Sequence, residues 1–177
     1  MVLNGATITE RGLVLGGVTS SLRDASYDLT IKDLVTSEGK IVDEYLLPAQ
    51  GIVKVISAEE VRMPQDVVGY VLVKTGLCNE GVLALNIGIV DPGFEGPLQS
   101  ALINFGKTDI RLHAGDVFSR ISFHALNAPG STRPAAVSRD SVQRSVKQQI
   151  DRFLPATFLD IPKTAEKAAE KMFADYK

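Results

Sequence analysis

Residues 89–104 read IVDPGFEGPLQSALIN, and the rest of the chain is organised around this stretch. It has the form of an apolar strand that ends in a carboxylate, turns, and returns as a second strand after Gly96. Pro92 fixes φ at about −65° at the second position of a four-residue turn, and Gly93 tolerates positive φ at the third. The pattern predicts a tight hairpin. Asp often begins such turns for structural reasons, so the turn alone gives Asp91 no chemical role.

Length and composition restrict the class of protein. The chain has 177 residues, 45% of them hydrophobic, which suits one domain with a sizeable core. A formal charge of −2 provides no basic field for a nucleic-acid polymer, so an anionic ligand needs local cationic groups. The single cysteine, Cys78, excludes an internal disulfide and fits a reducing compartment. No apolar run reaches the length of a membrane span. We therefore expect a cytoplasmic protein with no membrane and no nucleic-acid polymer as partner.

Several common kinds of active site are missing from the sequence. Two histidines and one cysteine leave no C-x-x-C, H-x-E or paired-histidine spacing, which excludes a zinc-dependent deaminase. The sequence also lacks G-x-x-x-x-G-K-[ST] and G-x-G-x-x-G, the usual phosphate-binding loops. Any chemistry must therefore come from carboxylates, hydroxyls and single cations.

Short strands account for the chain up to Leu126. Residues 25–31 alternate, which places Tyr27, Leu29 and Ile31 on one face and Asp28 on the other. Residues 67–73 are nearly all apolar, which is typical of a strand buried on both faces. At least eight such strands and no long helix predict an all-β barrel or sandwich over residues 1–126.

The segment after Val73 is the candidate phosphate site. Residues 74–81 read KTGLCNEG, a loop of small and polar residues between a buried strand and a glycine. Lys74 and Thr75 can offer an ammonium and a hydroxyl to a phosphate. The same residues also suit an ordinary solvated turn.

The composition changes at Asn127. We expect a linker over residues 127–135 and a helical extension over residues 136–177. Asp140 with Gln143 predicts a helix N-terminal capping box. An apolar stripe follows at Val142, Val146, Ile150 and Phe153, and a second at Ala165, Ala168, Ala169, Met172, Phe173 and Tyr176. Such stripes pack on the chain's own core or on a partner subunit.

The order of these pieces resembles the dUTPase and dCTP deaminase superfamily. The motifs that carry the resemblance are residues 25–29 (ASYDL), 61–64 (VRMP), 74–77 (KTGL), 89–96 (IVDPGFEG), Asn104 and 114–116 (AGD) with Phe118 and Ile121. The resemblance implies a dUTPase-like β-clip or distorted β-barrel, here with a C-terminal helical tail. It also implies a homotrimer with active sites at subunit interfaces. The ligand it implies is a pyrimidine deoxynucleoside triphosphate with Mg²⁺.

The resemblance assigns counterparts in this chain to some of the functional residues of the superfamily. Asp91 matches the aspartate that orients the attacking water in dUTPases, and is the candidate catalytic residue. The deaminases place their acid/base glutamate at the position of Ala101, and alanine cannot transfer a proton. We therefore expect no appreciable deamination. The candidate substrate-binding residues are Lys74, Thr75, Gly76, Asn79 and Phe94. No metal ligand is expected from the protein.

Three functions stay open at this point. The chain is an enzyme acting on dCTP or dUTP through Asp91, a nucleotide-binding regulator that has lost catalysis, or a trimeric scaffold that docks a partner through its helical tail.

Overall fold

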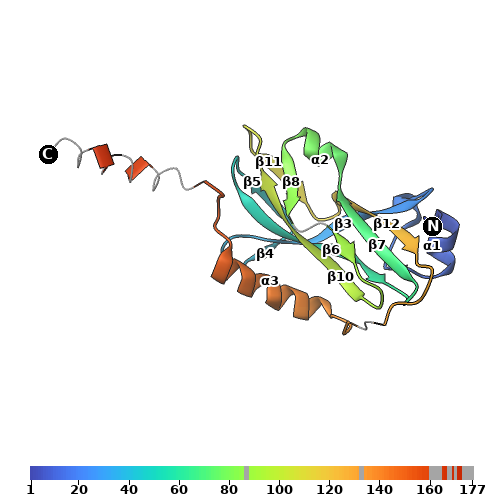
Figure 1. Cartoon of the computed structure of the whole chain (residues 1–177). Helices are drawn as coiled ribbons and strands as arrows, with labels where there is room; N and C mark the ends of the chain where they lie inside the picture. Colours follow the sequence, from blue (N-terminus) through green and yellow to red (C-terminus); the bar gives the residue numbers. More distant parts are fainter. Residues whose placement is uncertain (86–87, 132–133, 160–164, 167–168, 170, 173–177) are drawn as a thin grey trace.

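The computed structural model describes residues 1–85, 88–131, 134–159, 165–166, 169 and 171–172. Strands dominate the chain, and the longest helix follows them (Figure 1). In order, the elements are α1 (Gly5–Glu10), β1 (Val14–Leu15), η1 (Thr19–Ser21), β2 (Leu22–Arg23), β3 (Ser26–Val35), β4 (Ile41–Val42), β5 (Glu44–Leu47), β6 (Ile52–Arg62), β7 (Val67–Val73), α2 (Thr75–Asn79), β8 (Val82–Leu85), β9 (Ile89–Val90), β10 (Glu95–Asn104), β11 (Ile110–His113), β12 (Val117–Ala125) and α3 (Arg139–Phe153).

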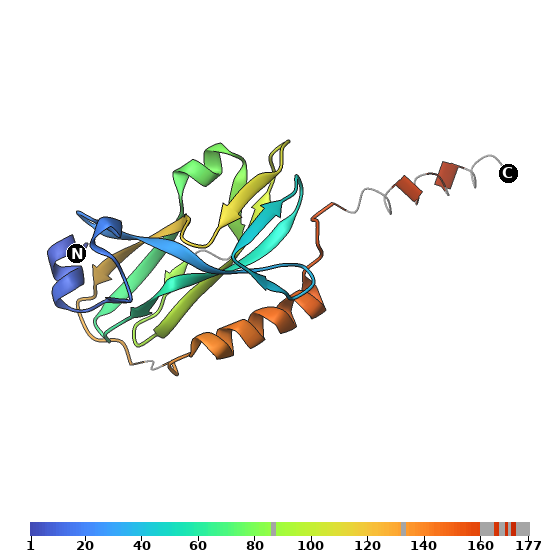
Figure 2. The ribbon, with the colours of Figure 1, turned by 180° about the vertical axis from the view of Figure 1, so that it is seen from behind.

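Most strands form one ten-stranded antiparallel sheet that curls on itself. Its main path runs β8-β10-β6-β3-β12-β7-β9, with β1, β2 and β4 paired at its sides. Strands β5 and β11 form a separate two-stranded sheet. Figures 1 and 2 show the curl from opposite sides, with α3 lying along the outside of the curled sheet. The predicted all-β distorted barrel with a C-terminal helix is confirmed. Its interior is filled by large, fully buried side chains that include Leu29, Leu102, Phe118 and Phe123.

The turn at residues 91–94 forms, but the predicted hairpin does not. The Phe94 N–H donates to the Asp91 carbonyl at 3.2 Å, and Gly93 has φ of 83°. Strand β9 pairs with β7, whereas β10 pairs with β6 and β8, and no described residue of β9 pairs with β10. The turn instead joins strands from the two ends of the curled sheet. Local turn chemistry predicts the bend, but it cannot say which strands pair across it.

One other strand expectation was wrong in part. Strand β7 has the predicted bounds, but Tyr70 and Leu72 are 42% and 63% exposed, so only one of its faces is buried in this chain. The reason is that no element of the described chain packs on its outer face. The apolar run 82–90 divides into β8 and β9, and residues 86–87 lie outside the described part. The predicted loop after Val73 contains the short helix α2.

The start of α3 differs from the predicted capping box. Ser138 is the N-cap, and its side chain accepts a hydrogen bond from the Ser141 N–H at 3.3 Å. Asp140 lies in the first turn, where its charge complements the helix dipole. The Gln143 amide donates to Asp33 Oδ2 at 3.0 Å, so it ties the helix to β3 and is not part of a cap.

The apolar stripe of α3 packs on the chain's own sheet. The stripe residues Val142, Val146 and Ile150 are buried against Val35 and Ile56. Phe153 was predicted to join them, but it is 72% exposed because the helix ends there and the chain turns away. Most of the second predicted helix lies outside the described residues. Its described members Ala165, Ala169 and Met172 are exposed.

Candidate functional site

A fully buried carboxylate, Asp28, binds three cationic side chains on the outer face of the sheet. Arg120 Nε lies 2.7 Å from Asp28 Oδ1, and Lys74 Nζ lies 2.9 Å from Oδ2. Arg23 donates from Nε and Nη2 to the same Oδ2 at 3.0 and 2.9 Å. The side chain of Asp28 is 0% exposed, whereas those of Arg23, Lys74 and Arg120 are 48%, 31% and 40% exposed. We call these four residues the cationic cluster. The carboxylate is covered by the three cations, and the cations are partly exposed to solvent.

The sheet register assembles this cluster. Asp28 on β3 is directly opposite Arg120 on β12, so their side chains share a face. Lys74 is the first residue after β7, the strand on the other side of β12. Arg23 comes from β2, which pairs with the start of β3. Four separate segments therefore meet at one carboxylate.

The charges of the cluster do not cancel. Burial by itself raises the pKa of Asp28, but hydrogen bonds from Arg120, Lys74 and Arg23 outweigh burial and hold this pKa well below its usual value. Asp28 is therefore ionised at neutral pH and neutralises one of three positive charges. The remaining positive charge, on partly exposed N–H donors, suits an anion such as a phosphate.

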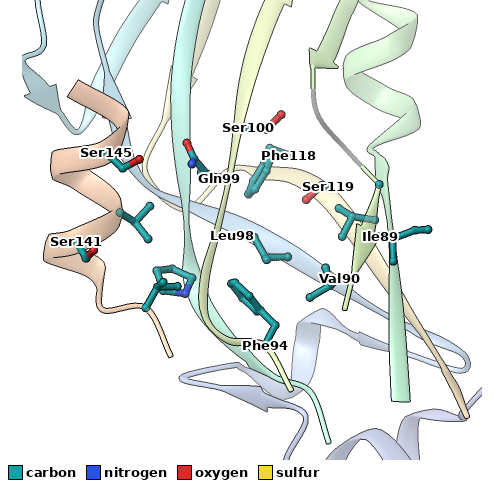
Figure 3. A pocket seen from close by; sticks show the side chains of 15 residues that line it. Ile89, Val90, Phe94, Leu98, Gln99, Ser100, Phe118, Ser119, Ser141 and Ser145 are labelled. Carbon is teal, nitrogen blue, oxygen red and sulfur yellow. The ribbon is translucent and has the colours of Figure 1, made fainter. Parts of the chain in front are cut away.

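A cavity of about 370 Å³ opens on the other side of β12, along the edge of β10. Figure 3 shows its walls: Leu98 and Phe94 lie on the side of Val90, while Gln99 lies toward Ser141 and Ser145 of α3. Among the described residues, strand β8 pairs with the second half of β10, at residues 101–104. The full lining is Val71, Gly88, Ile89, Val90, Phe94, Pro97, Leu98, Gln99, Ser100, Phe118, Ser119, Val137, Ser141, Val142 and Ser145.

Two buried polar atoms in this lining have no hydrogen-bond partner among the described residues. They are Gln99 Oε1 and Ser119 Oγ. Ser119 is completely buried, and its neighbour Phe118 is 2% exposed. Buried polar side-chain atoms in folded proteins are nearly always bonded to protein or water. The cavity therefore has unused hydrogen-bonding capacity.

The cavity and the cationic cluster lie on opposite faces of the same strand. Ser119 is opposite the core residue Leu29, and Arg120 is opposite Asp28. Consecutive side chains of a strand point to opposite faces, so Ser119 faces the cavity while Arg120 faces outward. A separate cavity of about 330 Å³ contains Lys74 and Gly76 in its lining, together with Asp116 and Arg111.

Comparison with protein families shows to which family the chain belongs. Residues 23–126, more than half of the chain, match the family model described as dCTP deaminase-like. The chain belongs to the dCTP deaminase-like family.

Individual members of this family are related at moderate identity. The dCTP deaminase of Thermococcus sibiricus is 29% identical over 134 residues, which cover 73% of this chain and 85% of that protein. The dCTP deaminase of Pyrococcus furiosus is 30% identical over 134 residues, covering 67% and 85%. The solved structure of 2'-deoxycytidine 5'-triphosphate deaminase from Agrobacterium tumefaciens superimposes with a TM-score of 0.59 at 14% identity, over 70% of this chain and 48% of that one. This structure shows the shared fold.

The residues predicted for the site of this dCTP deaminase-like chain fall in different places. Lys74 belongs to the cationic cluster, and Thr75, Gly76 and Asn79 follow it as the exposed residues of α2. Phe94 packs against the core and lines the 370 Å³ cavity.

Asp91, the candidate catalytic residue, is the first residue after β9. Its side chain is exposed and forms no hydrogen bond within the described part of the chain. It immediately follows Val90, which lines the 370 Å³ cavity. The carboxylate is thus free to meet a ligand or a water molecule.

Ala101, the position at which the sequence analysis expects the acid/base glutamate of the deaminases, is 2% exposed in the middle of β10. It pairs with Lys54 on β6 and with Leu85 on β8. Lys54 is 7% exposed, and burial lowers the pKa of its ammonium group. The amine of Lys54 makes no hydrogen bond or ion pair with any described residue.

Sequence reasoning missed Arg23 and Arg120 as site residues. The sequence contained one indication of them. Asp28 was predicted to lie on the face of its strand opposite to Tyr27, Leu29 and Ile31, and therefore away from the core. A carboxylate within an otherwise buried strand requires cationic partners, since a charge of this kind is rarely buried unpaired. The identity of those partners depends on strand pairing, which the sequence does not reveal.

Among the described residues, no group of three or more His, Cys, Asp or Glu side chains comes together in a way that could hold a metal ion. No described helix has the length and apolar character needed to cross a membrane.

Proposed function

We propose that the chain binds a pyrimidine deoxynucleoside triphosphate, dCTP or dUTP, and does not deaminate it. The observation that carries this proposal is the cationic cluster, in which one buried carboxylate holds three partly exposed cations. Asp28 fixes the positions of these side chains, so their remaining donors are pre-organised for phosphate oxygens. This proposal keeps Lys74 as a phosphate ligand and adds Arg23 and Arg120.

The base would occupy the 370 Å³ cavity beside the turn at Asp91. This volume is near the lower end of the range for small-molecule sites and suits a single ring. Its walls combine apolar residues such as Leu98 and Phe118 with a few polar atoms, which is typical of a ligand pocket.

Binding one nucleotide at both places requires more than one copy of the chain. The cavity and the cationic cluster lie on opposite faces of β12, so one copy would hold the base and a neighbour would hold the phosphates. The exposed apolar residues Tyr70, Leu72 and Ile89 on the outside of β7 and β9 provide a surface for such a neighbour. We therefore propose a homotrimer with sites between subunits. Light scattering should give about three times the chain mass of 19.0 kDa, and a stable monomer would contradict the arrangement.

Mg²⁺ would accompany the triphosphate. The described residues offer no cluster of three ligands for it, and the exposed carboxylate of Asp91 is a single oxygen donor group. They therefore fit a metal ion that arrives bound to phosphate oxygens, not one held by the protein alone. Such an ion would neutralise negative charge on the phosphates.

The same residues determine which reaction we expect. Deamination at C4 needs a group that moves protons, and Ala101 provides none. Asp91 remains available to orient a water molecule toward the α-phosphate, so the enzymatic form of the proposal is release of pyrophosphate. We also propose a cytoplasmic location for this activity.

The test is calorimetry with dCTP, dUTP and dTTP in the presence of Mg²⁺. Lys74→Ala should weaken triphosphate binding by about 1 to 3 kcal/mol, the cost of losing a charge-assisted hydrogen bond. Lys40→Ala is the matched control, because Lys40 is exposed and its one ion pair with a described residue is with Glu38. Asp91→Asn should leave binding unchanged and abolish any pyrophosphate release.

The outcomes separate the three original hypotheses. Binding with pyrophosphate release supports an enzyme, and binding without turnover supports a regulator. If none of the nucleotides binds at millimolar concentration, or if Lys74→Ala has no effect, the nucleotide site is wrong and the scaffold hypothesis is favoured. Ammonia release from dCTP at ordinary enzymatic rates would contradict the assignment of Ala101.

A further inference from the structure

Gln99 carries a buried carboxamide oxygen that nothing in the described chain satisfies. Its Oε1 has essentially no contact with solvent and no hydrogen-bond partner, and it belongs to the lining of the 370 Å³ cavity. Ser119, 0% exposed, brings a second unsatisfied oxygen to the same lining. An unsatisfied buried polar group costs about 1–3 kcal/mol, so two in one cavity indicate a polar ligand.

Gln99 lies in β10, two residues before the segment that pairs with the described residues of β8. It is opposite Ile56 on β6, and Ile56 packs against α3, so the side chain of Gln99 points to the helix side of the sheet. Its neighbour Leu98 points to the other side, toward Val90 (Figure 3). The cavity extends past both residues, and a planar ring at this edge would meet an apolar side chain and an amide.

Helix α3 closes the cavity on the side of Gln99. Ser141, Val142 and Ser145 contribute to the lining. The helix is held there by Arg139, which donates to the Ser57 and Ala58 carbonyls at 2.8 and 2.9 Å. All of α3 lies outside residues 23–126, so this wall is an addition to the part that matches the family model. By excluding water, the wall makes a hydrogen bond to Gln99 more discriminating.

We propose that Gln99 determines base specificity by accepting, through Oε1, a hydrogen bond from the C4 amino group of a cytosine ring. This inference depends on the proposed nucleotide function. Cytosine has an N–H donor at C4, whereas uracil has an oxygen acceptor at the same position. In the orientation that the structure records, Oε1 meets the cytosine amino group directly, whereas uracil is matched only if the carboxamide turns by 180° and presents Nε2.

The experiment compares the dissociation constants of dCTP and dUTP, with Mg²⁺, for the parent chain and for Gln99→Met. Methionine keeps the length and approximate volume of glutamine but removes the acceptor. The parent should prefer dCTP by about tenfold, and Gln99→Met should lose this preference mainly through weaker dCTP binding. Gln148→Met is the control, because Gln148 is exposed on α3 and absent from the cavity lining. It should change neither constant.

Each of the other possible results contradicts the inference about Gln99. If the parent binds nucleotides but Gln99→Met leaves the ratio unchanged, the specificity role is wrong while the proposed function stands. An equal loss for both nucleotides would make Gln99 a structural residue and would also overturn the inference. If the parent binds neither nucleotide, the proposed function fails and this inference fails with it. Thermal unfolding of Gln99→Met verifies that the variant is folded.

Discussion

Ser119 and Arg120 lie on opposite faces of β12, and the buried polar groups on these two faces differ in their hydrogen bonding. On the outer face, Arg120 helps to satisfy Asp28, whose two oxygens receive hydrogen bonds from three side chains. On the inner face, Ser119 Oγ has no partner among the described residues. A fully satisfied buried polar group stabilises the fold, whereas an unsatisfied one reduces stability unless a ligand or water completes it. The difference separates residues that hold the sheet together from residues that are available for binding.

The largest loss of stability is expected from removing the charge of Asp28. Asp28→Asn leaves three cations close together around a neutral amide, and we expect the free energy of unfolding to fall by about 3 kcal/mol. Urea denaturation measures the change. Asp24→Asn, at an exposed neighbouring position, should cost less than about 0.5 kcal/mol. If the two variants are equally stable, the cluster does not support the fold.

The same carboxylate should make stability depend on pH. Its pKa is lowered in the folded chain, so the unfolded chain binds the proton first, below about pH 4, and stability falls as the pH decreases further. Between pH 5 and pH 2.5 the loss from this one group should be about 2 kcal/mol. The measurement is the difference between parent and Asp28→Asn, which cancels the other carboxyl groups. Identical pH profiles would mean that Asp28 is not strongly paired.

A smaller effect of opposite sign is expected at Lys54, a residue only 7% exposed whose amine has no partner among the described residues. Lys54→Met removes an unpaired charge and keeps the aliphatic chain, so it should raise the free energy of unfolding by about 1 kcal/mol at pH 7. Because burial lowers the pKa of Lys54, the advantage should shrink as the pH rises toward 10 and the parent loses its charge. The exposed Lys107→Met is the control. A destabilised Lys54→Met would show that the amine has a partner in the assembled protein.

The smallest effect is expected at the unsatisfied hydroxyl. Ser119→Ala removes no hydrogen bond within the described chain, so the free energy of unfolding should change by less than about 1 kcal/mol, in the stabilising direction. Thermal unfolding without nucleotide provides the comparison with Asp28→Asn. A loss of several kcal/mol would show that Ser119 is bonded in the folded chain, and the contrast between the two faces of β12 would disappear.

Periodicity and turn chemistry were sufficient for much of the local structure. The bounds of β7, the bend at Pro92-Gly93 and the buried stripe of α3 all follow from patterns within a few residues. The alternation around Asp28 also placed that carboxylate away from the core face. Counting residues from Asp91 identified Ala101 as the position compared with the deaminase glutamate. These features depend on neighbours along the chain, which is the information that a sequence displays directly.

Only the tertiary structure decided which segments meet. The sequence predicted that Asp91 begins a hairpin, yet β9 pairs with β7 and β10 with β6, because closure of the sheet depends on contacts between distant strands. The same strand register brings Arg23 and Arg120 to Asp28 beside Lys74. The unsatisfied atoms of Gln99 and Ser119 could not be predicted at all, since a missing partner is a property of the surroundings in space and not of the residue type.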